Sequence, residues 1–383
     1  MRVCFVSGSY PPIRCGIGDF AQRLAAALTQ QGIAVSVLTS KDGVMSGRDG
    51  AVMRMPVVSD WNMGALPTIL SELCALAPDL VNIQYPTQRY GRQPLVNLLP
   101  WFIRARLHIP TVTTVHEFST FRRLGKWRIG LSVLSSDHVI VPDQVNLEQM
   151  TQMFPGARSK FTRVPIGANI EPRWPNDLDR CRVRASFDAT DADVVIAYFG
   201  FISPSKGIET LLRAFQQASQ VETNLRLLLI ASREPADPNY TAYHRRVTEM
   251  IEELRMGDRI FWTGYGAPAQ VSAYLASADF AALPFTDGVS RRRTSLLTAL
   301  AHGLPVISTA PPALTPEDLN EEAGLELVPI HNASALANTM VNLAQDRIRR
   351  ELLAARARQF AGTFSWANIA AQTLAVYQRV LRG

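Results

Sequence analysis

The sequence has few cysteines and no long apolar run, and each shortage excludes a class of protein. Its 383 residues contain only four cysteines, far apart and without C-x-x-C spacing, so neither a disulfide framework nor a zinc site is indicated and buried thiols are expected. No apolar stretch approaches the roughly 18 to 20 residues that span a bilayer. The apolar run at the N-terminus is also too short for a secretory signal, so we expect a cytoplasmic protein.

Lysine is scarce too, and arginine supplies nearly all of the positive charge: the only lysines are Lys41, Lys126, Lys160 and Lys206. The formal net charge of +6 favours an anionic partner such as nucleic acid, acidic lipid or a phosphorylated metabolite. Nucleic acid is disfavoured, because the basic residues are not interleaved with aromatic residues in a recognisable binding module. Arginine suits bidentate contacts with phosphate.

The length and the alternation of short apolar runs with helical-period segments predict two α/β domains with parallel sheets. The first series of strands is expected at residues 2–7, 33–39, 80–84, 111–115, 137–141 and 161–165, and completes a domain over residues 1–170. A polar segment, residues 171–192, is expected to be a linker. The second series is expected at 194–199, 225–230, 259–262, 280–283 and 306–308, in a domain over residues 193–364. An amphipathic helix over residues 365–383 follows and should dock on another element.

Ligands of such sheets bind at the carboxyl ends of the strands, so the loops after strands carry the candidate site. Gly16 and Gly18 follow the first strand and precede a helix expected from Asp19, where small residues let backbone N–H groups approach an anion. A tight turn explains these glycines equally well. The spacing is not that of a dinucleotide-binding loop and no acidic residue closes the next strand, so an NAD-dependent enzyme is disfavoured.

A second loop, beginning at Gly200, places Lys206 in the expected first turn of a helix. A cation there opposes the helix dipole, which is unfavourable unless an anionic ligand compensates. The alternative is a solvated surface lysine. The sequence therefore suggests an anion site after the strand at 194–199.

A third loop carries three consecutive arginines, Arg291, Arg292 and Arg293, directly before a helix. Thr294 or Ser295 is the expected N-cap, and Gly303 should end the helix. Arginines beside a helix N-terminus favour a phosphate site, although at least one of the three side chains must face solvent.

With these motifs, the chain resembles the retaining nucleotide-sugar glycosyltransferases of family 4, which have the GT-B fold. The resemblance covers nearly the whole chain and is carried by the segments Pro11–Leu24, Val112–His116, Val164–Ala168, Lys206–Gly207 and Ala299–Val306. It implies two Rossmann-like, doubly wound domains facing across a cleft, with the final helix crossing back to the N-terminal, acceptor-side domain. The second domain would bind the nucleotide sugar.

The resemblance also implies roles for single residues. Lys206 matches the phosphate lysine of the family, and His116 matches a histidine near the transferred sugar, although a histidine at a strand end is often structural. The reaction implied is sugar transfer with retained configuration and no cofactor or metal, since lysine and arginine supply the positive environment for the leaving diphosphate. The donor would be a UDP- or GDP-sugar, and the acceptor a glycan, a lipid-linked glycan or a small molecule.

Two departures from the family pattern stand in the donor site. Phe201 replaces the usual arginine after Gly200, and Ser290 and Thr298 occupy the places of two glutamates. Asp287 lies close enough to replace the first glutamate, the arginine run can replace the lost arginine, and Thr298 either offers a hydroxyl to a ribose or is ordinary helix surface. The alternatives to a transferase are a non-catalytic sugar-nucleotide or glycan-binding relative, and a sugar-nucleotide epimerase on the same fold.

Two further expectations concern specificity and location. Arg233 and Tyr265 follow strands and are candidates for contact with the nucleotide base. Residues 101–106 and 121–131 mix tryptophan and aliphatic residues with arginine and lysine, a composition suited to an anionic membrane surface and a lipid-linked acceptor. A buried helix with a solvated basic edge explains that composition equally well.

Overall fold

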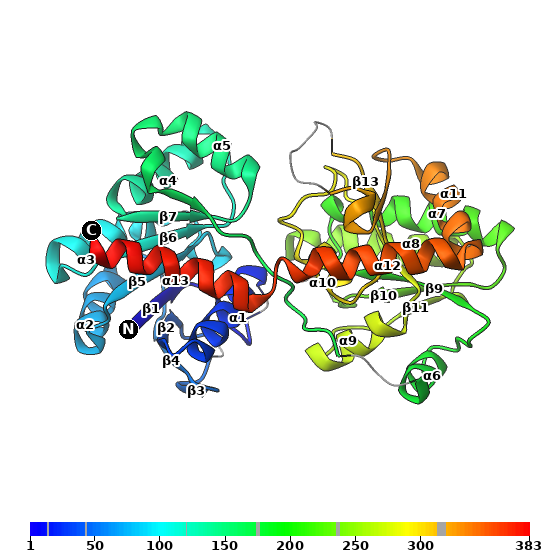
Figure 1. Cartoon of the computed structure of the whole chain (residues 1–383), viewed down its shortest axis with the longest axis horizontal. Helices are drawn as coiled ribbons and strands as arrows, with labels where there is room; N and C mark the ends of the chain where they lie inside the picture. The colour runs from blue at the N-terminus through cyan, green and yellow to red at the C-terminus, as the bar shows by residue number, and fades with distance from the viewer. Residues whose placement is uncertain (14, 43, 120, 174–176, 235–237, 312–318) are drawn as a thin grey trace. The chain divides into compact units, whose positions relative to one another are not determined.

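The chain folds into two compact units. The structure is a computed structural model that describes residues 1–13, 15–42, 44–119, 121–173, 177–234, 238–311 and 319–383. Unit 1 consists of residues 1–169 and 364–383, and unit 2 of residues 170–363. Each unit contains one sheet flanked by helices (Figure 1). The predicted α/β class with two Rossmann-like domains is confirmed.

Unit 1 is built on an eight-stranded sheet in the order β3-β4-β2-β1-β5-β6-β7-β8, parallel except where β3 pairs with β4. Its strands are β1 (Arg2–Ser7), β2 (Ala34–Ser40), β3 (Gly47–Asp49), β4 (Val52–Val58), β5 (Leu80–Tyr85), β6 (Thr111–Val115), β7 (His138–Val141) and β8 (Phe161–Arg163). Its helices are α1 (Gly16–Gln30), α2 (Leu66–Leu76), α3 (Leu95–Leu107), α4 (Arg123–Ser135), α5 (Gln144–Met153) and α13 (Trp366–Arg382). The first and fifth strands are neighbours, which places the reversal of strand order between them.

Unit 2 is built on a six-stranded, fully parallel sheet in the order β11-β10-β9-β12-β13-β14. Its strands are β9 (Val194–Phe199), β10 (Leu225–Ile230), β11 (Ile260–Trp262), β12 (Phe280–Leu283), β13 (Val306–Thr309) and β14 (Leu325–Val328). Its helices are α6 (Asp177–Ala185), α7 (Ile208–Val221), α8 (Thr241–Glu253), α9 (Pro268–Ser277), α10 (Thr294–Ala301), α11 (Ala333–Gln345) and α12 (Arg347–Gly362). Strand order reverses between β9 and β12.

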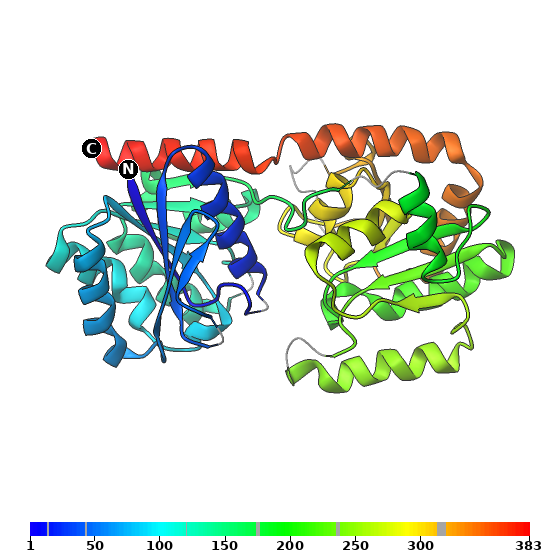
Figure 2. The same ribbon diagram turned by 90° about the horizontal axis from the view of Figure 1, so that it is seen from below.

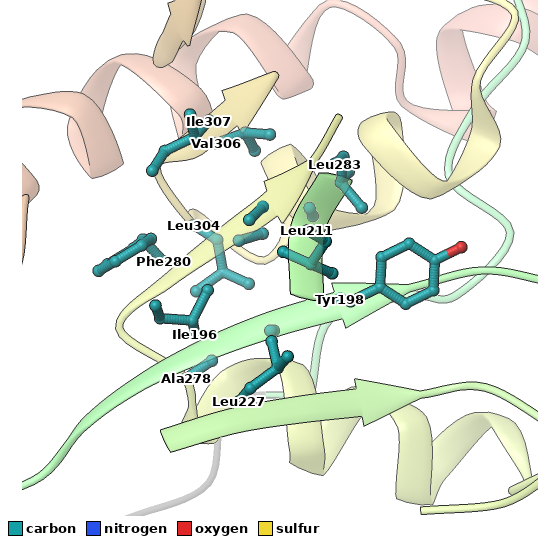
Figure 3. Close-up of a cluster of buried hydrophobic side chains, with 14 of the residues drawn as sticks. Ile196, Tyr198, Leu211, Leu227, Ala278, Phe280, Leu283, Leu304, Val306 and Ile307 are labelled. Carbon is teal, nitrogen blue, oxygen red and sulfur yellow. The ribbon is translucent and has the colours of Figure 1, made fainter. Parts of the chain in front are cut away.

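The core of unit 2 explains why its strands read as continuous apolar runs. Ile196, Leu227 and Phe280 come from three neighbouring strands and are fully buried, as expected for strands covered on both faces (Figure 3). Tyr198 lies in the same cluster, but its hydroxyl points away from the apolar side chains and donates to the carbonyl of Phe201 at 2.9 Å. The buried strand therefore ends at a polar edge.

Three strands were missed by the sequence patterns. β4 contains Pro56, which has no N–H to join a sheet ladder, and this strand still pairs with β2 on one side and with β3 on the other. β3 and β14 are short, and neither shows a clear alternation of apolar and polar residues. All three lie at or beside a sheet edge, where burial constrains composition least.

The C-terminal helix α13 belongs to unit 1 and packs against α1, as Figure 2 shows. Tyr377 is buried, and its hydroxyl accepts a hydrogen bond from the side-chain amide of Asn82 in β5. Trp366 donates its indole N–H to the carbonyl of Ala168 at 2.7 Å and lies 5.4 Å from the ring of Phe20. The last residues of the chain therefore complete the core of the unit that contains the first.

The segment expected as a linker, residues 171–192, is instead a packed part of unit 2, except that residues 174–176 lie outside the described residues. Arg184 of α6 is buried, donates to the carbonyl of Ser277 at 2.9 Å and pairs with Asp279 at 2.8 Å. The same carboxylate accepts the backbone N–H of Val195 at 2.7 Å. This ion pair fixes α6 to the sheet, although the helix is too polar to predict a core contact.

The expectation of buried thiols holds for Cys4 alone. Burial raises the pKa of this thiol to about 12, so it stays protonated. Cys15 is half-buried, and Cys74 and Cys181 are exposed. All four are free thiols.

The loops that follow β9 and β12 approach each other closely. The N–H of Thr286 donates to the carbonyl of Ser205 at 3.2 Å. Gly207 has φ of +67°, and a Cβ at this residue would lie 1.9 Å from the carbonyl oxygen of Pro284. Only glycine fits there, because both the left-handed backbone and the contact exclude a side chain.

We predict that Gly207→Ala destabilises unit 2 by at least about 2 kcal/mol, since it adds backbone strain to a steric clash. Gly257→Ala is the matched control, because a Cβ there meets nothing within 4 Å. Urea unfolding of the two variants measures the difference. Equal midpoints for Gly207→Ala and wild type would contradict the close approach of the two loops.

Candidate active site

The predicted donor residues gather at the carboxyl edge of the sheet of unit 2, in the loops after β9 and β12. These strands are neighbours, and the strand order reverses between them. In open parallel sheets, ligands bind outside the carboxyl ends of the strands at such a reversal. The loop after β13 joins them: the N–H of Val289 donates to the carbonyl of Thr309 at 2.9 Å, and Gly288 lies against the backbone of Pro311.

Two cations from different loops share one aromatic ring in this site. The ring of Phe285 lies 5.1 Å from Nζ of Lys206 and 4.6 Å from the guanidinium carbon of Arg293. Arg293 is also ion-paired with Asp287. We call Lys206 and Arg293 the cation pair; it brings two positive charges together beside a single carboxylate.

Lys206 lies before helix α7 and not in its first turn. It ends a short 3-10 turn, Pro204–Lys206, and Gly207 separates it from the helix. Burial, as the largest cause, and the charge of Arg293 lower the pKa of Lys206 to about 8, although the charge of Asp287 acts in the opposite direction. The amine is therefore held where its positive charge is costly until an anion accompanies it.

The three arginines do not act together. Arg293 faces Phe285, whereas the guanidinium carbon of Arg291 lies 5.1 Å from the ring of Phe360 in α12. Arg292 is half-buried. Of the three, Arg293 therefore shares the ring of Phe285 with Lys206, and Arg291 faces a different ring, as expected for consecutive side chains that enter a helix.

The N-terminus of α10 differs from the expected capping pattern. Arg293 is the N-cap, and its side chain makes no capping hydrogen bond, so neither Thr294 nor Ser295 has that role. Backbone N–H groups of the first turn are thus left to other acceptors. Thr294 lies half-buried in that first turn.

Three hydroxyls of the predicted site are buried and lack a hydrogen-bond partner among the described residues: those of Ser290, Ser295 and Thr298. Ser295 faces the loop after β9, because a Cβ at Gly200 would meet its Cβ at 3.8 Å. Gly200 has φ of +147°, a conformation that favours glycine. A buried hydroxyl without a partner costs free energy, so these groups fit a ligand with several acceptor oxygens.

Asp287 is the only acidic side chain that a described contact places at the cation pair. It is exposed and pairs with Arg293. Ser290 and Thr298, in the places of the family's glutamates, carry hydroxyls and no charge. The positive charge of this edge is therefore not balanced by carboxylates among the described contacts.

The predicted histidine at the end of β6 is buried in unit 1. Nε2 of His116 lies 2.9 Å from Oε1 of Gln84, and its ring contacts Phe20 of α1 at 4.7 Å in an edge-on arrangement. Burial lowers the pKa of His116 to about 3, so the ring is neutral at physiological pH. A neutral imidazole bonded through Nε2 offers Nδ1 as an acceptor.

Gly16 and Gly18 lie within the first turn of α1 and not in a loop before it, because the helix begins at Gly16. They differ in surroundings: a Cβ at Gly18 would lie 3.0 Å from the carbonyl oxygen of Ser9, whereas a Cβ at Gly16 would meet nothing within 4 Å. Gly18 is therefore explained by packing. Gly16 remains a candidate for a close approach of ligand to the helix end.

The two candidates for base contact lie on the loops after β10 and β11. Arg233 donates through Nη2 to the carbonyl of Trp262 at 2.9 Å, so its guanidinium connects these loops. Tyr265 is exposed. Neither residue has a described contact with the cation pair.

Sequence reasoning missed Phe285, the residue that organises the site. It is fully buried and follows β12, so an apolar pattern reads it as core. The available signal was the pair Pro284-Phe285 at the end of a buried strand, directly before a glycine loop. His302, in a segment that carried the resemblance, is structural: its Nδ1 donates to the carbonyl of Thr298 and its Nε2 bonds to Ser272 of α9.

Across the residues that the structure describes, no group of three or more His, Cys, Asp or Glu side chains is arranged to hold a metal ion. Two cations, Lys206 and Arg293, lie together at the carboxyl edge of unit 2, and Asp287 pairs with one of them. The arrangement is one that binds an anion with several oxygens and stabilises negative charge on it.

Comparison with known proteins identifies the family. Residues 15–167 match the model of a glycosyl transferase 4-like domain, and residues 193–346 match glycosyl transferases group 1. The chain is 23% identical over 398 residues to the D-inositol 3-phosphate glycosyltransferase of Nocardia farcinica, covering 96% of this chain and 85% of that protein.

Solved structures share the fold. A sucrose-phosphate synthase from Thermosynechococcus elongatus superimposes with a TM-score of 0.78 at 20% identity, covering 100% of this chain and 99% of that one. Anabaena HepE, in complex with UDP and glucose, gives 0.73 at 17% identity, with 98% and 99% covered. The two family models together span well over half of the sequence, and the chain belongs to the family 4 glycosyltransferases with the GT-B fold.

Proposed function

We propose that this glycosyltransferase moves a sugar from a nucleoside diphosphate sugar to a glycan, lipid-linked or small-molecule acceptor, with retained configuration and without a metal. The observation that carries the proposal is the cation pair beside Phe285, next to three buried hydroxyls without partners. The HepE neighbour was solved with UDP, which supports a nucleotide donor. UDP- and GDP-sugars are the first donors to test.

In this proposal the cation pair holds the diphosphate. As the bond from the sugar to the diphosphate breaks, the leaving oxygen gains negative charge, and preformed cations stabilise that charge more than they stabilise bound donor. Ser290, Ser295 and Thr298 donate to phosphate or ribose oxygens, and the first-turn N–H groups of α10 add to the same field. Asp287 orients Arg293.

Unit 1 supplies the acceptor side. His116 is neutral, so it would contribute a hydrogen bond near the transferred sugar and no positive charge. Gly16 would let the acceptor or donor approach the N-terminus of α1. No helix in the described part of the chain is long and apolar enough to cross a bilayer. We include peripheral contact with an anionic membrane, on its cytoplasmic face, in the proposal, since a lipid-linked acceptor would require it.

A second function, binding of sugar nucleotides without transfer, is favoured by one observation. The two positions that hold glutamates in the family carry Ser290 and Thr298 here. Such a protein would bind the nucleotide through the same cations and turn nothing over. Binding and turnover must therefore be measured separately.

We predict that Lys206→Ala and Arg293→Ala each lower kcat/KM by about a hundredfold, because each removes a charge that stabilises the transition state. Arg291→Ala is the matched control and should stay within about twofold of wild type, since its guanidinium stacks on Phe360. Product formation from UDP- and GDP-sugars gives turnover. The thermal shift with the same nucleotides measures binding, since a ligand at 100 times its Kd stabilises the folded protein by about 2.7 kcal/mol.

The outcomes separate the two functions. If wild type binds the nucleotide but turns over no donor with any acceptor, and Lys206→Ala abolishes the binding, the protein binds sugar nucleotides without transferring sugar. Donor consumption without an acceptor selects an epimerase. Wild-type affinity and turnover in Lys206→Ala would eliminate the role of the cation pair.

The pKa of Lys206, lowered to about 8, predicts a pH dependence of donor binding. The amine of the free protein loses its proton as pH rises through 8, so donor affinity falls above this pH by up to about tenfold per pH unit, because the anion binds the charged form. Isothermal titration between pH 6.5 and about 9.5 measures the slope. Lys206→Arg should keep its affinity across this range, since arginine stays protonated; a parallel decline in that variant would assign the titration to another group.

Metal independence predicts that transfer continues in excess EDTA, because the cation pair supplies the charge that Mg²⁺ supplies in metal-dependent enzymes. The assay compares initial rates with EDTA, with Mg²⁺ and with Mn²⁺. A rate that disappears with EDTA and returns with either ion would show that the leaving diphosphate needs a metal.

A further inference from the structure

Helix α4 of unit 1 carries apolar side chains on two faces, and only one of them is covered. Ile129 and Val133 are buried in the core of unit 1. The other face is a stripe with helical spacing, which we call the outer stripe: Leu124 is 86% exposed, Trp127 62%, Leu131 44% and Leu134 64%. A surface helix ordinarily exposes polar residues on the face away from the core.

The neighbouring helix α3 extends this surface. It packs against α4, and the two helices are joined by the side-chain amide of Asn97, which donates to the hydroxyl of Ser132 at 3.3 Å. Trp101 of α3 is 56% exposed. Exposed tryptophan and leucine side chains on adjacent helices are unfavourable in water and mark a surface that another phase or molecule covers.

The charges around the outer stripe have one sign. Neither α3 nor α4 contains an aspartate or glutamate, whereas together they carry Arg104, Arg106, Arg123, Lys126 and Arg128. The described contacts of Lys126 and Arg128 are with neutral groups: the side-chain oxygen of Gln149 at 2.9 Å and the carbonyl of Arg92 at 3.0 Å. Among the described ion pairs of these two helices, Arg104 pairs with Asp137 at 3.2 Å. The surface is therefore apolar along its centre and positive around it.

We propose that the outer stripe of α4, with Trp101 of α3, is the surface through which this protein docks on a bilayer that contains anionic lipid. The apolar side chains enter the boundary between headgroups and acyl chains, and the basic side chains contact the headgroups. The occupant is a membrane because the surface combines an exposed apolar stripe, two exposed tryptophans and an excess of basic over acidic side chains on both helices. The inference deepens the proposed membrane contact and rests on it.

The basic residues set the lipid dependence. Each lysine or arginine near an anionic surface is attracted to it, and salt screens that attraction. Insertion of the apolar stripe is insensitive to salt. Binding should therefore need both anionic lipid and the stripe, and should weaken as salt rises.

Vesicle flotation tests the proposal with the full chain. Vesicles of phosphatidylcholine alone are compared with vesicles in which about one third of the lipid is phosphatidylglycerol. We expect binding to the anionic vesicles only, weakened at high salt, with tryptophan emission shifting to shorter wavelength. Leu124→Glu/Leu134→Glu should lower the partition coefficient at least tenfold, since it places negative charge in the stripe.

Ile348→Glu/Leu352→Glu is the matched control, because these are exposed apolar residues on α12 of unit 2. It should bind vesicles like wild type. Equal binding of both double variants, or equal binding to neutral and anionic vesicles, would overturn the proposal. So would a concentration-dependent dimer that Leu124→Glu/Leu134→Glu abolishes, which would make a second copy the occupant.

The thermal shift with nucleotide sugars, measured on the same variants, tests the donor site independently of membrane docking. The stripe lies in unit 1 and the cation pair in unit 2, so Leu124→Glu/Leu134→Glu should keep the wild-type nucleotide shift. Loss of flotation in wild type with an intact nucleotide shift would reject docking and leave the donor site standing. Flotation without any nucleotide shift would reject the donor site and leave docking standing.

Discussion

The donor site depends on two cations that share one aromatic ring. Lys206 and Arg293 come from separate loops, and the ring of Phe285 accepts both. The two cations carry charge of the same sign, and Asp287 pairs with Arg293. Like charges that share a ring repel each other, and an anionic ligand would remove this repulsion. Burial, and after it the charge of Arg293, lower the pKa of Lys206.

Backbone contacts hold this unfavourable arrangement in place. Gly207 lets the loop after β9 touch the carbonyl of Pro284, and the N–H of Thr286 bonds to Ser205 across the same gap. Without these contacts the loops would separate and the cations would move into water, where their charges cost little. The orphaned hydroxyls of Ser295 and Thr298 lie on the helix that this loop precedes. Unpaired hydroxyls and like charges thus occur together at one edge of one sheet, as expected where function outweighs stability.

The sequence predicts the elements better than it predicts their contacts. The buried strands of both sheets follow from apolar runs, whereas β4, which contains Pro56, was not predicted. The position of Lys206 was misread by two residues, because a glycine with positive φ ends one turn and begins the next helix, and sequence periodicity does not register such a break. Which of the three consecutive arginines faces which ring depends on Phe285, in the same loop, and on Phe360, in the distant helix α12. Apolar patterns assign both rings to the core, so their contacts with cations were not predictable.

For the same reason, the sequence alone could not show which face of α4 is exposed. Its composition is compatible with a buried helix, because apolar residues occur on every side of it. Only the packing of Ile129 and Val133 into unit 1 decides which face is covered, and the remaining leucines then become exposed by geometry. Burying the outer stripe as well would require another layer of structure, which the described part of unit 1 does not place there. Unit 1 covers one face of α4, so the partner of the exposed apolar face lies outside this unit. The positive charge around that face indicates that the partner is anionic.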